Sequence, residues 1–185
     1  MSSLVDKFKS RVYVKGLSLK KLPVCTFIGV SLIIIFLLYN TKVLNSIPCG
    51  GSFKEIFCSN FCHIDPLHLI TNLFYLYVLS TIEQEMGAKS FIWLIVLLLL
   101  LNTLIEYFAR IIFKYSKCSI GFSGILFGMM AWQLLTKNEF DPLIIIAIGI
   151  SIISSSKYKD VSLFGHVLGA ITGIIGALIW SKLVH

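Results

Sequence analysis

Long runs of apolar side chains alternate with short polar stretches along most of the chain. An α-helix rises about 1.5 Å per residue, so about 20 apolar residues cross the hydrocarbon core of a bilayer. The pattern predicts an all-α membrane protein, a six-transmembrane-helix bundle forming a single domain over residues 23–185. The predicted spans lie near residues 24–39, 66–82, 91–112, 123–136, 142–153 and 162–183.

Helix-start signals support two of these spans. Asp65 and Asp141 each precede a proline, and an aspartate N-cap followed by proline at the first helical position is a typical helix start. Residues 40–62 are expected to form an outer connection, because proline and glycine interrupt them. Residues 83–89 are expected to form a short inner turn after the second span.

Composition excludes a soluble globular domain. Of 185 residues, 57% are hydrophobic and 14% are charged, and the mean hydropathy is +0.89. The 16 Lys and Arg against 9 Asp and Glu give a net charge of +7, which in a soluble protein would suggest nucleic-acid binding. In a membrane protein such an excess mainly sets orientation, so we expect a lipid bilayer, and no nucleic acid, as partner.

Residues 1–22 form a basic tail ahead of the first span. By the positive-inside rule this tail predicts a cytoplasmic N-terminus for a multi-pass protein. A disordered tail and a short amphipathic helix on the membrane surface are both open interpretations. The basic residues, set against Asp6 alone, are Lys7, Lys9, Arg11, Lys15, Lys20 and Lys21.

Four polar side chains are predicted to meet near the outer surface. With a cytoplasmic N-terminus and six spans, the second, fourth and sixth helices all run from outside inward. His68 and Asn72 fall in the first two turns of the second helix. Ser123 and His166 fall in the first turns of the fourth and sixth, hence at a similar depth. Polar side chains inside a bilayer are costly and mark function by default.

Glycines are predicted to bring Ser123 and His166 together. Small residues four apart let helix backbones approach closely in lipid, so the fourth and sixth helices can pack face to face. Ser123 and His166 would then come within hydrogen-bond reach, which is the arrangement of an activated serine nucleophile. The glycine pairs are Gly124 with Gly128 and Gly169 with Gly173.

An acyl-transfer site also needs hydrogen-bond donors for the developing oxyanion. The candidates are the backbone N–H of Ser123, at a helix start, and the side chains of His68 and Asn72. No carboxylate in the last three spans is placed to orient His166, so the sequence predicts a Ser–His dyad. Phe127, one turn below the serine, is expected to pack against the imidazole ring.

These motifs resemble those of the rhomboid intramembrane serine proteases, six-helix bundles that cleave transmembrane substrates within or near the bilayer. The resemblance covers about residues 57–179. Three motifs carry it in order, namely His63 with His68-xxx-Asn72, Gly121-x-Ser123-Gly124, and His166-xx-Gly169-xxx-Gly173.

The resemblance implies an endopeptidase that acts on transmembrane or juxtamembrane segments of membrane proteins. Ser123 would be its nucleophile and His166 its general base, with His68 and Asn72 in the oxyanion hole. No metal and no small-molecule cofactor are expected. Supporting positions are expected at Gly121, Gly124, Phe127 and His63.

The details of the resemblance predict the cellular membrane in which the protein resides. The first outer loop is short and lacks the Trp-Arg pair of many bacterial and secretory rhomboids. In this loop, and from Cys118 to Phe127, the chain looks more like the small endoplasmic-reticulum type, so an endomembrane such as the endoplasmic reticulum or Golgi is expected. Disulfides and free thiols are both open for the outward-facing Cys49, Cys58, Cys62 and Cys118.

Two alternatives to a peptidase remain open. A catalytically inactive rhomboid-like protein would bind membrane clients without cutting them. A small transporter or proton relay would use His68, Glu106 and His166, although Glu106 and Asn102 are otherwise interpreted as contacts between helices. A zinc protease is not supported, because His-Glu-xx-His is absent and the four His and five Cys show no usual ligand spacing.

Overall fold

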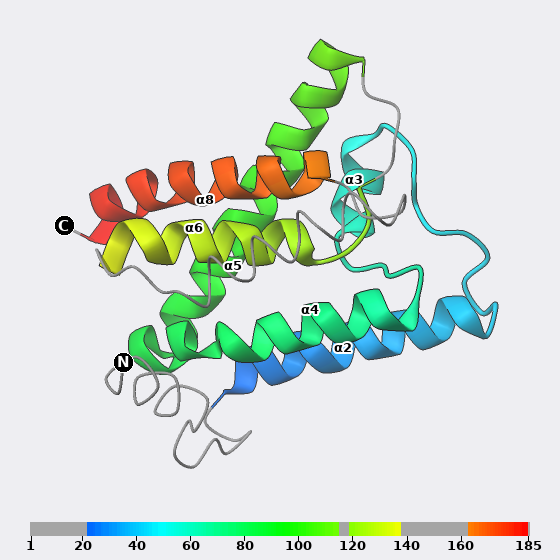
Figure 1. Ribbon diagram of the computed structural model, residues 1–185, viewed down its shortest axis with the longest axis horizontal. Helices are drawn as coiled ribbons and strands as arrows, with labels where there is room; N and C mark the ends of the chain where they lie inside the picture. The colour runs from blue at the N-terminus through cyan, green and yellow to red at the C-terminus, as the bar shows by residue number, and fades with distance from the viewer. Residues whose placement is uncertain (1–21, 115–118, 138–162, 185) are drawn as a thin grey trace, which may run out of the picture.

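Helices make up the regular structure of the described chain, which in this computed structural model covers residues 22–114, 119–137 and 163–184. Figure 1 shows α4, α6 and α8 all beginning at the end of the molecule where α3 lies, here called the α3 end. The predicted all-helical fold is therefore confirmed for these residues. The helices are α2 (Pro23–Asn40), α3 (Phe53–Ser59), α4 (Pro66–Val78), α5 (Ser80–Phe113), α6 (Ser123–Lys137) and α8 (Leu163–Val184).

Helices α2 and α4 lie side by side (Figure 1), and a carboxylate from α5 caps the start of α2. The N-cap residue of α2, Leu22, has no side chain that can accept a hydrogen bond. Instead Glu83 accepts from the backbone N–H groups of Val24 and Cys25, at 2.9 and 2.8 Å, one bond to each carboxylate oxygen. A negative charge at a helix N-terminus is favourable, so this buried glutamate joins α2 to α5.

The connection between the second and third predicted spans differs from the expected inner turn over residues 83–89. Helix α4 ends at Val78, and α5 begins at Ser80, so most of that stretch is helical. The change of direction occurs at Gly87, where φ is +79°, inside α5. Glycine adopts this left-handed conformation without the steric cost that a side chain would bring. The kink therefore replaces a loop.

Helices α6 and α8 pack closely along their length and cross α5 (Figure 1). The predicted close approach of the glycine pairs is confirmed. A methyl group added to Gly169 would overlap the backbone of Gly124, and one added to Gly173 would overlap the carbonyl oxygen of Gly128. At the opposite end of the molecule from α3, Lys137 of α6 forms an ion pair with Glu85 of α5.

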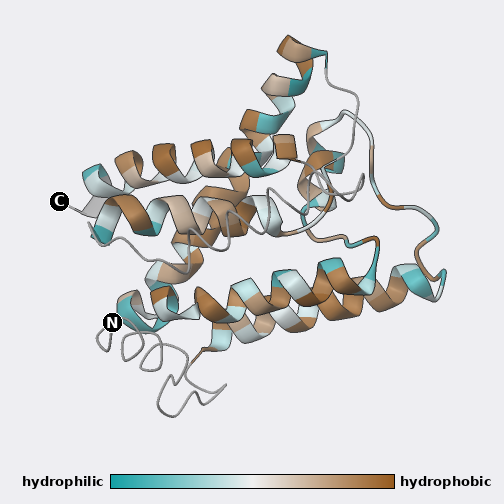
Figure 2. Cartoon of the chain, in the orientation of Figure 1, coloured by the Kyte–Doolittle hydropathy of each residue, from teal (hydrophilic) through white to brown (hydrophobic). Residues whose placement is uncertain are grey.

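Hydrophobic residues make up much of the described helices, as Figure 2 shows, and many of their large side chains are exposed. Phe27 of α2, for example, is 73% exposed, and such surface is stable in lipid rather than in water. Within the described residues, α2, α5 and α8 are long and apolar enough to span a bilayer. Helices α4 and α6 are shorter, with 13 and 15 residues. The predicted fifth span, residues 142–153, lies outside the described residues.

Candidate active site

Ser123 begins α6, and the turn before it fixes where its backbone points. Gly121 has a φ of +109°, a conformation that L side chains rarely adopt. Its N–H donates to the carbonyl oxygen of Ser59 at 3.0 Å, which ties the turn to the end of α3. Phe122, the residue between Gly121 and Ser123, is fully buried, and its ring centroid lies 6.0 Å from that of Phe61. Ser123 itself stays partly exposed at the helix start.

His166 in the first turn of α8 reaches Ser123 across the α6–α8 contact. Its Nε2 lies 3.0 Å from the serine Oγ, which is hydrogen-bond distance. The imidazole is 6% exposed and stacks on Phe127, with ring centroids 4.4 Å apart and planes 12° from parallel. The expected packing of Phe127 against the imidazole ring is therefore confirmed, and the stacked arrangement holds the ring edge toward the hydroxyl.

His68 and Asn72 lie on α4, which approaches the turn at Gly121 that precedes Ser123. Asp65 caps this helix, accepting from the His68 N–H at 2.8 Å. The imidazole of His68 packs against Gly121 so closely that a methyl group there would lie 2.7 Å from Nε2. Asn72 is buried and donates from Nδ2 to the His68 carbonyl oxygen at 2.8 Å. One of its two amide hydrogens remains outside this bond.

His63 precedes α4, and its ring packs against the ring of His68. The two rings meet edge to face, with centroids 5.1 Å apart. Burial disfavours the imidazolium form and, together with the charge of His68, lowers the pKa of His63 to about 3. His63 is therefore a neutral packing surface at physiological pH, consistent with the supporting role predicted for it.

A family assignment follows from comparison with known proteins. The Rhomboid domain family model matches residues 50–183. The chain belongs to the rhomboid family. A protein of Acanthamoeba polyphaga mimivirus, provisionally named a rhomboid, is 28% identical over 133 residues, which cover 71% of this chain and 78% of that protein. Rhomboid-like protein 11, chloroplastic, of Arabidopsis thaliana is 27% identical over 90 residues, 49% of this chain and 31% of that protein.

A small polar pocket lies beside the Ser123–His166 pair of this rhomboid. Its volume is about 10 Å³, close to the smallest space that holds one water molecule. Amide, carboxylate, hydroxyl and imidazole groups surround it, so a water bound there would find several hydrogen-bond partners. Its lining is Asn60, Asn102, Glu106, Ser119, Ile120, Gly121, Ser123, Gly124, Gly165 and His166.

Two residues at or near this rhomboid's site had no role predicted from the sequence. Asn60, just after α3, accepts at Oδ1 from Asn102 Nδ2 at 3.1 Å and lines the pocket. Arg110 donates from Nε and Nη2 to Oε1 of Glu106, at 3.0 and 2.6 Å. Asn60 lies in a loop-like polar stretch without a motif, whereas the four-residue spacing of Glu106 and Arg110 was a usable signal for an ion pair.

Cysteines in the described part of the rhomboid take both forms that the sequence left open. Cys49 is disulfide-bonded, whereas Cys58 and Cys62 are free. Cys118 lies outside the described residues. Within the described ranges, no three His, Cys, Asp or Glu side chains come together in an arrangement that could hold a metal ion.

Proposed function

We propose that this rhomboid is an intramembrane serine endopeptidase with a Ser123–His166 dyad. The observation that carries the proposal is the 3.0 Å distance between His166 Nε2 and Ser123 Oγ, made across two helices at the start of each. A serine held against a buried imidazole is the arrangement that nucleophilic catalysis requires. A serine that only allows two helices to pack closely needs no imidazole partner.

In the proposed reaction, Ser123 Oγ bonds to the scissile carbonyl carbon while its proton passes to His166 Nε2. The C–N bond then breaks, and the imidazolium returns the proton to the leaving amine. Water attacks the acyl-enzyme next, giving its proton to His166, and Oγ regains a proton as the ester bond breaks. The pocket beside the pair is a fitting place for that water, because polar groups line it.

The oxyanion is stabilised by the Ser123 backbone N–H together with the side chains of His68 and Asn72. The packing of His68 on Gly121 and the free amide hydrogen of Asn72 support this assignment. Removing one oxyanion donor typically lowers kcat by about 10² to 10³-fold, so these residues contribute without being indispensable.

The proposed substrates are transmembrane or juxtamembrane segments of membrane proteins that enter from the lipid. The N-terminus is cytoplasmic, six helices span an endomembrane, and the α3 end faces the noncytoplasmic side. A substrate must present an extended backbone, because an intact helix keeps its carbonyl groups hydrogen-bonded. Cleavage sites are therefore expected where small or helix-breaking residues occur. No cofactor is required.

Cleavage of a transmembrane substrate in liposomes tests this function. Ser123→Ala and His166→Ala are each expected to lower the cleavage rate by at least about 10³-fold, because the dyad acts as a unit. Ser181→Ala, an exposed serine near the far end of α8, is the matched control and should cleave normally. Undiminished cleavage by either dyad variant would contradict the Ser123–His166 assignment. A folded wild type that neither cleaves nor reacts with a fluorophosphonate would instead favour an inactive client-binding protein.

A further inference from the structure

Three buried polar residues follow one face of α5 toward the α3 end, and we call them the polar stripe. Asn102, Glu106 and Arg110 are four residues apart, so they lie above one another on the helix. Their exposed fractions are 2%, 2% and 8%. Burying a charge is costly unless it is paired, and here the arginine and glutamate compensate each other through two hydrogen bonds to the same carboxylate oxygen.

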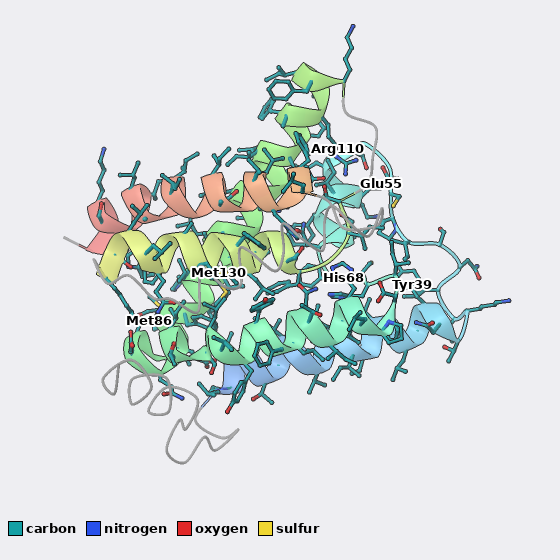
Figure 3. All side chains as sticks on the ribbon, viewed as in Figure 1. Tyr39, Glu55, His68, Met86, Arg110 and Met130 are labelled. Carbon is teal, nitrogen blue, oxygen red and sulfur yellow. The ribbon has the colours of Figure 1, made fainter. Side chains whose placement is uncertain are left out.

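The polar stripe also forms hydrogen bonds to the segment that contains α3, one to a residue before that helix and one to a residue after it. Arg110 uses its remaining nitrogen, Nη1, to donate to the Gly50 carbonyl oxygen at 3.1 Å, ahead of α3. Asn102 donates to Asn60, directly after α3, at 3.1 Å. Figure 3 shows Arg110 and Glu55 of α3 at the same end of the molecule as His68. Two separate bonds therefore fix α3 against α5.

The end of α3 in turn holds the turn that carries the serine. The Ser59 carbonyl oxygen accepts the Gly121 N–H at 3.0 Å, and Gly121 packs against the imidazole of His68. A displacement of α3 would thus move Gly121, which lies two residues before Ser123. The serine backbone N–H and the His68 ring would both lose their alignment toward the oxyanion.

We propose that Arg110, oriented by Glu106, is a positioning residue for the Ser123 turn, acting through Gly50, α3 and Ser59. This inference rests on the proposed peptidase activity and adds a residue that the dyad alone does not require. Of this pair, Glu106 lines the pocket beside Ser123 and His166, whereas Arg110 is not among the residues that line it. Its effect is therefore expected on the alignment of groups that act in the transition state, and so on kcat rather than on KM.

The test compares kcat and KM of Arg110→Gln with those of the wild type in liposomes. Endpoint labelling with a fluorophosphonate counts the competent sites, so that kcat is expressed per labelled site. Arg110→Gln is expected to lower kcat by about 10- to 100-fold with KM changed less than about 2-fold, since small misplacements at an active site cost rates of this size. Glu106→Gln, which keeps an acceptor for the arginine, should lose less.

Lys137→Gln is the matched control, because it removes a cation from another ion pair of α5, at the opposite end of the molecule. Its kcat per labelled site should equal that of the wild type. Arg110→Lys keeps the charge but not the fork of donors, and should fall between the wild type and Arg110→Gln. This variant also serves if Arg110→Gln does not fold.

Three results would overturn the positioning role of Arg110. These are an unchanged kcat per labelled site in the Arg110 variants, a loss confined to KM, and an equal kcat loss in Lys137→Gln. A wild type that neither cleaves nor labels would instead overturn the proposed function itself. The two failures are therefore distinguishable.

Discussion

His63 shows how burial sets the chemistry of a single residue in this protein. Its side chain is 1% exposed, and the ring of His68 lies edge-on beside it. The folded pKa of about 3 lies well below the ordinary value of 6.5, so folding favours the neutral ring. An uncharged His63 can pack against the candidate oxyanion donor without repelling it. The residue therefore links the stability of the α4 start to pH.

This depressed pKa predicts an acid-sensitive contribution to stability. Between about pH 6.5 and pH 3 the unfolded chain binds one more proton at His63, so the free energy of unfolding falls as pH falls. The contribution is complete above pH 6.5, and its loss is at most about 1.4 kcal/mol per pH unit. Unfolding in detergent should show a shallower acid decline in His63→Gln than in the wild type. Identical pH profiles would contradict this origin.

The candidate site was predictable in part at the residue scale, for a physical reason. Ser123 and His166 are far apart in sequence, yet both sit at starts of apolar helices whose direction and depth follow from the hydrophobic pattern. The bonds of Asn60 and Gly50 span 42 and 60 residues and involve a short helix and a loop. Hydrophobic periodicity does not place such segments, so these contacts were beyond sequence reasoning.

At the scale of elements, the contact between α6 and α8 brings the dyad together. Gly169 meets the backbone of Gly124 directly, and Gly173 meets that of Gly128 one turn further along. The small-residue spacing predicted this contact, because only glycine allows such an approach. The kink inside α5 was not predictable in the same way. It needs a left-handed φ at Gly87, whereas the surrounding residues are compatible with either a turn or a helix.

Widening the α6–α8 contact is predicted to separate the dyad. Gly169→Ala adds a methyl group that overlaps Gly124, and overpacking of this kind typically costs about 1–3 kcal/mol. We expect a lower unfolding temperature and at least about a 10-fold slower cleavage per folded molecule. Gly51→Ala is the matched control, because no atom lies within 4 Å of the added carbon. Normal cleavage by Gly169→Ala would show that the close approach is unnecessary.

At the scale of the whole molecule, the site lies at one end of the bundle. Helices α4, α6 and α8 start together at the α3 end, and α2 ends near the same level (Figure 1). The basic tail of residues 1–22 precedes the opposite end of α2, and positive charge favours the cytoplasmic side. The α3 end therefore faces the noncytoplasmic side in the proposed topology.

Accessibility of single cysteines tests that topology. Lys42→Cys lies beyond the α3 end of α2, and Lys182→Cys lies near the opposite end of α8, with both positions exposed. In sealed vesicles with the cytoplasmic side outward, a membrane-impermeant maleimide should label Lys182→Cys at once. Lys42→Cys should react only after the vesicles are permeabilised. The chain without either substitution gives the background, and the reverse order of labelling would invert the proposed orientation.

Modification by a fluorophosphonate, with its rate measured and its site identified by peptide mass spectrometry, tests the Ser123–His166 dyad most directly. One modified residue, Ser123, is expected in the folded wild type. The modification rate of His166→Ala is expected to be at least about 10³-fold lower, because the imidazole activates the hydroxyl. Folded wild-type protein that resists the reagent, or a His166→Ala variant that reacts as fast as the wild type, would contradict the Ser123–His166 dyad.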